Sequence, residues 1–213
     1  YTGAIYKYNS PSSDGAKIGA CSRLTFSFTL EIPEAGDGEP LNAFNLAFRF
    51  RLYQKASTSG SKDFVLAQIS GNELKALNDK GTTLVKLEPG KPVNFTVSVN
   101  RDTRVLDYYI GDTLIKSVTV SESSNATTAN YALAAKNEDG TFVYNYAIPM
   151  NMYCGPASAG SLILDNMACY AGVLKSAGDN SDYFEQVFPD MRTEKVVGAS
   201  MTLNEDINMN FFA

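Results

Sequence analysis

The stretch VNFTVSVNRDTRVLDYYIGDTLIKSVTV, residues 93–120, decides the fold class. In its first eight residues apolar and polar side chains alternate without a break, and the apolar ones are Val93, Phe95, Val97 and Val99. This period of two is typical of a strand with one buried and one wet face, as in antiparallel sheets. Gly111-Asp112 separates two later alternating segments and is typical of a two-residue hairpin loop that needs positive φ. The stretch therefore predicts a meander of antiparallel strands.

The same alternation recurs along the chain. It is clearest at 24–31 and 44–52, where every second residue is Leu or Phe. Shorter strands are expected at 64–69, 73–76, 83–87, 141–147 and 161–170. Helical periodicity is not convincing over any dozen residues, and turn-forming residues separate the strands. We therefore predict an all-β fold, a two-sheet antiparallel sandwich.

Composition narrows the function classes. The chain has 213 residues, 44% of them hydrophobic, which is enough to bury a sizeable core. Its formal net charge is −5 and it has no cluster of Lys and Arg, so we expect no nucleic-acid partner. It has no apolar run of 18 residues, so we expect no membrane insertion.

Three cysteines, Cys21, Cys154 and Cys169, are an odd count without CxxC spacing. This pattern argues against both a disulfide framework and a zinc site. A Cys154–Cys169 bridge remains open for an exported protein, but the sequence favours three buried thiols. Cysteine usage therefore does not fix the compartment.

The composition changes after residue 174. We predict a sandwich domain at 1–174, a polar linker at 175–194, and further strands at 195–213, where alternation resumes. Two strands cannot bury an apolar face alone, so the last segment either docks on the sandwich or begins another module. We favour the second arrangement and expect neighbouring domains in one longer polypeptide.

Four segments together resemble a known family: LTFSFTL (24–30), FTVSVNRDT (95–103), LDYYIGDTLIK (106–116) and LILDNMACY (162–170). They resemble the laminin-G-like jelly-roll modules of the concanavalin A-like superfamily, over about residues 24–173. The resemblance implies a jelly-roll sandwich. It also implies that a structural calcium ion at Asp165 is compatible with the fold, although the sequence does not decide whether a metal is bound. Residues 198–212 resemble the opening of a repeated module in large exported proteins of Gram-positive gut bacteria, which implies an extracellular or cell-surface location.

The superfamily includes laminarinase-type β-glucanases, which place two Glu and one Asp on a single strand so that the carboxylates reach one glycosidic bond. The nearest approach here is Glu34, Asp37 and Glu39, but glycines and a proline make that segment a loop. The absence of His excludes a Ser-His-Asp triad. We therefore predict a protein that is not an enzyme and has no cofactor.

Binding is the remaining class of function. The resemblance implies glycan recognition on a sheet face or at loop tips, through aromatic stacking and polar side chains. The candidate ligand-binding residues are Arg49, Arg51, Tyr53, Asn94 and Tyr109. The absence of Trp weakens this prediction, because Trp is the favoured platform for sugar rings. Arg49 and Arg51 would equally suit pairing with an acidic residue on a neighbouring strand.

We therefore predict a non-catalytic carbohydrate-binding or adhesion-type module of a larger exported surface protein. Its partner would be a glycan or cell-surface polysaccharide. The alternatives are a structural spacer without a ligand and, ranked lower, a glycoside hydrolase with unrecognised carboxylates.

Overall fold

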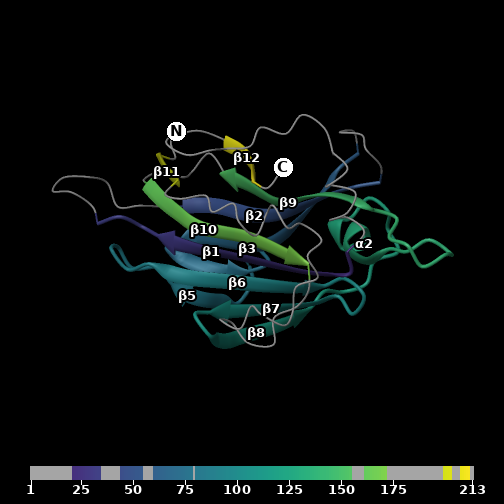
Figure 1. The fold of residues 1–213 in the computed structure, drawn as a ribbon, viewed down its shortest axis with the longest axis horizontal. Coiled ribbons are helices and arrows are strands. Elements are labelled where there is room, and N and C mark those ends of the chain that lie inside the picture. Colours follow the sequence, from purple (N-terminus) through teal and green to yellow (C-terminus); the bar gives the residue numbers. More distant parts are fainter. Residues whose placement is uncertain are drawn as a thin grey trace.

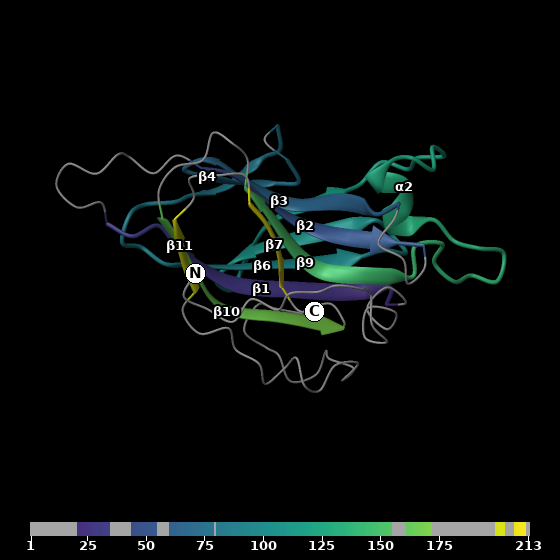
Figure 2. The same ribbon diagram turned by 90° about the horizontal axis from the view of Figure 1, so that it is seen from above.

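A computed structural model describes residues 21–34, 44–54, 60–78, 80–154, 161–171, 199–202 and 207–211. They form two antiparallel six-stranded sheets that pack face to face as a β-sandwich (Figure 1, Figure 2). The predicted all-β class and the two antiparallel sheets are confirmed. No helix in this part of the chain is long and apolar enough to cross a membrane.

The first sheet has the order β11-β10-β1-β6-β7-β8. Its strands are β1 (Arg23–Glu31), β6 (Val93–Asn100), β7 (Val105–Ile110), β8 (Thr113–Thr119), β10 (Ser161–Ala171) and β11 (Ala199–Thr202). The opening stretch of 93–120 is the β6-β7-β8 meander, as the alternation predicted. Gly111 turns the β7–β8 hairpin with a φ of 54°, a conformation that glycine adopts without steric cost.

The second sheet has the order β12-β9-β2-β3-β4-β5. Its strands are β2 (Phe44–Tyr53), β3 (Lys62–Gly71), β4 (Glu73–Ala76), β5 (Thr83–Lys86), β9 (Tyr146–Cys154) and β12 (Ile207–Phe211). The strand expected at 141–147 begins only at Tyr146, and Phe142 before it forms an isolated bridge with Lys136.

Aromatic side chains from both sheets fill the space between them. Phe28 of β1 packs against Phe48 of β2 with ring centroids 4.7 Å apart, and Phe26 packs against Phe50 at 5.8 Å. All four rings are buried, and burial of each such side chain stabilises the fold by about 1.5–3 kcal/mol. The period-two pattern therefore places these residues where the two sheets meet.

A hydrogen bond between buried groups joins the two sheets through the core. The Tyr108 hydroxyl on β7 donates to the Leu66 carbonyl oxygen on β3 at 2.7 Å, and the Tyr108 side chain is fully buried. Burial raises the pKa of Tyr108 above its ordinary value, which keeps the hydroxyl protonated as a donor. The two sheets are thus joined by a specific contact as well as by apolar packing.

The C-terminal strands lie in the sandwich itself, whereas a separate module was expected at 195–213. β11 pairs with β10 and β12 pairs with β9, so each adds an edge strand to one sheet of the sandwich. This is the docked arrangement that the sequence left as the second choice. The edge strand of an existing sheet has unpaired backbone N–H and C=O groups that can bond to an added strand. Two strands on their own are only marginally stable, because they cannot bury an apolar face. The linker expected at 175–194 lies outside the described residues.

Candidate ligand-binding groove

A groove with a volume of about 450 Å³ opens at one end of the sandwich, beside helix α2 (Ala129–Ala134). Figure 1 shows α2 at this end, away from the middle of the strands. The side chains that give the groove its chemistry are Asp102, Arg104, Glu122, Asn130, Tyr131 and Lys136. We call this feature the end groove. Its size falls in the range of small-molecule sites, and it combines an aromatic ring with convergent polar groups.

Helix α2 positions the aromatic ring. Thr128 caps the helix, because its side-chain oxygen accepts a hydrogen bond from the Tyr131 backbone N–H at 3.2 Å. The Tyr131 ring stands edge-on to the Tyr144 ring, with centroids 6.3 Å apart and an interplanar angle of 84°. The cap and the ring contact hold Tyr131 at the groove wall.

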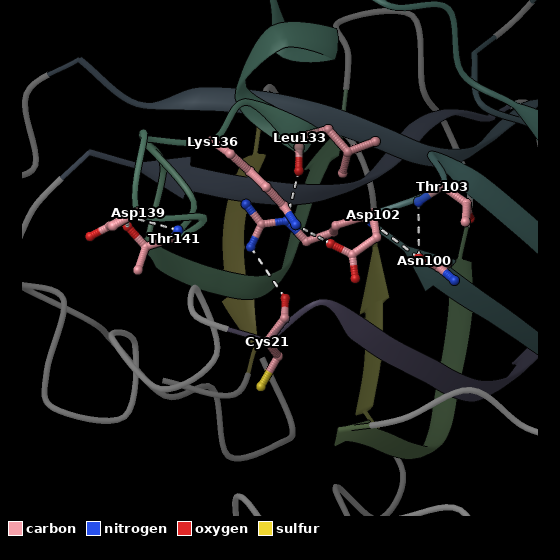
Figure 3. Close-up of polar contacts among 9 residues, drawn as sticks. Cys21, Asn100, Asp102, Thr103, Leu133, Lys136, Asp139 and Thr141 are labelled. Carbon is pink, nitrogen blue, oxygen red and sulfur yellow. Dashed lines mark hydrogen bonds and ion pairs between the residues drawn. The ribbon is translucent and has the colours of Figure 1, made fainter.

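The turn between β6 and β7 forms a second wall. The Asn100 side-chain oxygen accepts hydrogen bonds from the backbone N–H groups of Asp102 and Thr103, both at 3.1 Å (Figure 3). Arg104 closes the turn with a φ of 60°, which is uncommon for a residue with a side chain. Its carbonyl oxygen accepts from the Val120 N–H at 2.8 Å. These bonds fix the positions of Asp102 and Arg104 at the groove.

The charges of the end groove form two pairs. Lys136 Nζ lies 2.5 Å from Asp102 Oδ1 (Figure 3), and Arg104 Nη2 lies 3.6 Å from Glu122 Oε2. The side chains of the first pair are 42% and 41% exposed, and Glu122 is 79% exposed. Exposed pairs of this kind stabilise a protein by at most about 1 kcal/mol. The groove is therefore electrically balanced, and its donors and acceptors can exchange partners at low cost.

Arg101 supports both walls from beneath. It is fully buried and donates to the Leu133 carbonyl oxygen in α2 at 2.7 Å and to the Tyr144 carbonyl oxygen at 2.9 Å. A third, longer bond of 3.4 Å reaches the Cys21 carbonyl oxygen before β1 (Figure 3). The guanidinium carbon lies 3.7 Å from the centre of the Phe142 ring, and burial lowers the pKa of Arg101 to about 9. Arg101 lies in the turn after β6, and the sequence carries no local signal of this role.

Three of the residues that the sequence named lie together on the outer face of the second sheet. Arg49 and Arg51 of β2 both bond to Asp63 of β3, at 2.7 Å and 2.6 Å. This is the cross-strand pairing that the sequence left open as the alternative to ligand binding. The hydrogen bond to Asp63 raises the pKa of Arg51, whereas burial lowers that of Arg49. Tyr53 is buried, which raises its pKa, and it hydrogen bonds with Arg51.

The other two residues, Asn94 and Tyr109, lie in the first sheet. The Asn94 side-chain oxygen accepts from the Thr29 hydroxyl at 2.8 Å, and Tyr109 is buried opposite Thr96. The five predicted residues are therefore divided between two sheets, and none of them lines the end groove. Sequence reasoning missed the groove because its residues come from a turn, a loop and a short helix that carry no periodic pattern.

In the described part of the chain, no group of three His, Cys, Asp or Glu side chains converges where it could hold a metal ion. The Asp165 side chain accepts a hydrogen bond from the Asn166 backbone N–H at 2.7 Å. The side chains of Cys154 and Cys169, and the residues Asp37 and Glu39, lie outside what the structure describes.

No protein-family model matches the sequence, and no curated protein matches it. The function must therefore be inferred from the geometry of the site itself.

Proposed function

We propose that the protein is a non-catalytic carbohydrate-binding module that recognises a neutral oligosaccharide in the end groove. The observation that carries this proposal is the juxtaposition of the Tyr131 ring with paired donors and acceptors in one groove of about 450 Å³. A sugar ring has an apolar face, which suits an aromatic side chain, and hydroxyl groups that both donate and accept. Asp102 and Glu122 supply acceptors, and Arg104 and Lys136 supply donors.

We also propose that the two-sheet sandwich is a jelly-roll. A jelly-roll of the concanavalin A-like type is supported by the strand order, because β2 to β5 are successive neighbours in one sheet and β6 to β8 in the other. β1 and β10 lie side by side in the first sheet although they are far apart in the chain. An extracellular or cell-surface setting, with glycans as partners, is proposed with the function.

The two carboxylates of the groove favour binding over catalysis. A glycosidase needs one carboxyl group that holds a proton, which proteins arrange by placing it in an apolar pocket. Asp102 and Glu122 instead face the cations Lys136 and Arg104 and are open to solvent. Their environments are alike, whereas an acid and a base need contrasting ones.

A binding panel tests the proposal. The whole chain would be titrated by calorimetry with oligosaccharides from glucan, mannan and xylan. Replacing Tyr131 by Ala should weaken binding by about 0.5–1.5 kcal/mol, roughly two- to tenfold, whereas Tyr131→Phe keeps the ring and should bind nearly as the wild type. Lys91→Ala, an exposed site outside the groove lining, is the matched control.

The outcomes separate the candidate functions. Binding that survives Tyr131→Ala unchanged would refute the end groove as the site. The absence of binding to any member would favour a structural spacer. Release of reducing sugar from the panel would show a glycoside hydrolase.

A further inference from the structure

The cluster of Arg49, Arg51 and Asp63 on the second sheet has more donors than acceptors. Two guanidinium groups share one carboxylate, so the three side chains carry a net charge of +1. The cluster reaches the surface only in part, with exposed side-chain fractions of 14%, 17% and 24%. A positive charge in such a place lacks the full hydration that would stabilise it.

The two arginines use different edges of the guanidinium group. Arg51 holds Asp63 with its side-on edge, through Nε to Oδ1 at 2.6 Å and Nη2 to Oδ2 at 2.9 Å. Arg49 reaches Oδ2 of Asp63 with Nη1 alone, at 2.7 Å. The corresponding Nε and Nη2 groups of Arg49 are buried and have no hydrogen-bond acceptor among the described residues.

This pattern of donors has a defined chemical complement. Nε and Nη2 form two parallel donors whose spacing matches the two oxygens of a carboxylate. The Tyr153 ring lies 4.4 Å from the Arg49 guanidinium carbon and covers one face of the group. A stacked ring holds the guanidinium plane, so the donor pair has a fixed orientation. Buried donors without an acceptor are rare in proteins, so each one needs a physical explanation, and a bound ligand is one such explanation.

We propose that the side-on edge of Arg49 binds the carboxylate of an acidic sugar, in the bidentate manner in which Arg51 holds Asp63. Both N–H groups lie below the surface, so we expect binding to require a movement of the side chains that cover this edge of Arg49. This site lies on the outer face of the second sheet, and none of its residues lines the end groove. It would give the protein a second subsite, selective for a uronic acid over a neutral hexose.

The test uses the ¹⁵N-labelled whole chain and the ¹H–¹⁵N signals of the arginine Nε groups. Sodium D-glucuronate is the probe, and D-glucose at the same ionic strength is the control. Glucuronate should shift the Arg49 Nε signal, and glucose should not. Arg49→Lys, which keeps the charge but removes the donor pair, both assigns that signal and should weaken glucuronate binding about tenfold or more.

A matched variant controls for the loss of a guanidinium outside both sites. Arg23→Lys changes an exposed arginine of β1 and should leave the affinity for glucuronate unchanged. An unshifted Arg49 signal would overturn the proposal, as would a glucuronate affinity that Arg49→Lys leaves unchanged or that Arg23→Lys lowers equally. If Arg49→Lys does not fold, the wild-type titration decides. The sequence has six arginines, and Tyr153→Phe, which changes the ring stacked on Arg49, then assigns the Arg49 Nε signal among them.

Discussion

Replacing Arg101 by Lys should destabilise the protein strongly although the charge is conserved. Arg101 makes two well-formed bonds, at 2.7 Å and 2.9 Å, to carbonyl oxygens of Leu133 and Tyr144. A lysine at this position has a single terminal nitrogen and cannot span both acceptors in the geometry of the planar fork. A hydrogen bond from a charged donor contributes about 1.5–3 kcal/mol, and an acceptor left buried adds a further penalty. We therefore expect a loss of about 2–4 kcal/mol.

Urea unfolding followed by far-ultraviolet circular dichroism measures this loss. With a slope of about 2 kcal/mol per molar urea, the midpoint should fall by roughly 1–2 M. Amide hydrogen exchange should also become faster in α2, because Leu133 loses its tie to the β6–β7 turn. Arg23→Lys, at an exposed position of β1, is the control and should change stability by less than about 0.5 kcal/mol.

If Arg101→Lys unfolds within about 0.5 kcal/mol of the wild type, the carbonyl bonds do not support the fold. If stability falls while exchange in α2 is unchanged, Arg101 does not hold the groove wall.

Three further predictions concern single side chains. Tyr108→Phe should lower the free energy of unfolding, measured with urea at neutral pH, by about 1 kcal/mol. Because folding raises the Tyr108 pKa, the wild type should lose stability as the pH rises above about 10, and the variant should lose less. Lys116→Ile on the exposed edge strand β8 should increase the mass measured by light scattering as concentration rises, whereas Lys116→Glu should not. Asp63→Asn should lower the free energy of unfolding by about 2–3 kcal/mol, because two partly buried guanidinium groups lose their carboxylate, and a loss within the range of surface mutations would contradict this.

The sequence predicted the sheets better than it predicted the candidate site. Alternation marks a strand because its side chains point to opposite faces in turn, so the meander of 93–120 could be identified locally. Helix α2 is only six residues long and shows less than two turns of any period. Arg101 resembles an ordinary turn residue, since its acceptors come from residues 32 and 43 positions away. The docking of β11 and β12 likewise depends on edges that only the assembled sandwich provides.

The cross-strand hydroxyl pairs between β1 and β6 have a consequence for folding. Thr25 hydrogen bonds with Ser98 at 2.9 Å and Ser27 with Thr96 at 3.0 Å, across 73 and 69 residues of chain. Strands so distant in sequence meet slowly, and they can meet in a shifted register. A slip of one residue would separate both pairs and turn the hydroxyl groups toward the apolar core. The two hydroxyl pairs therefore favour the native register between β1 and β6, the two central strands of the first sheet.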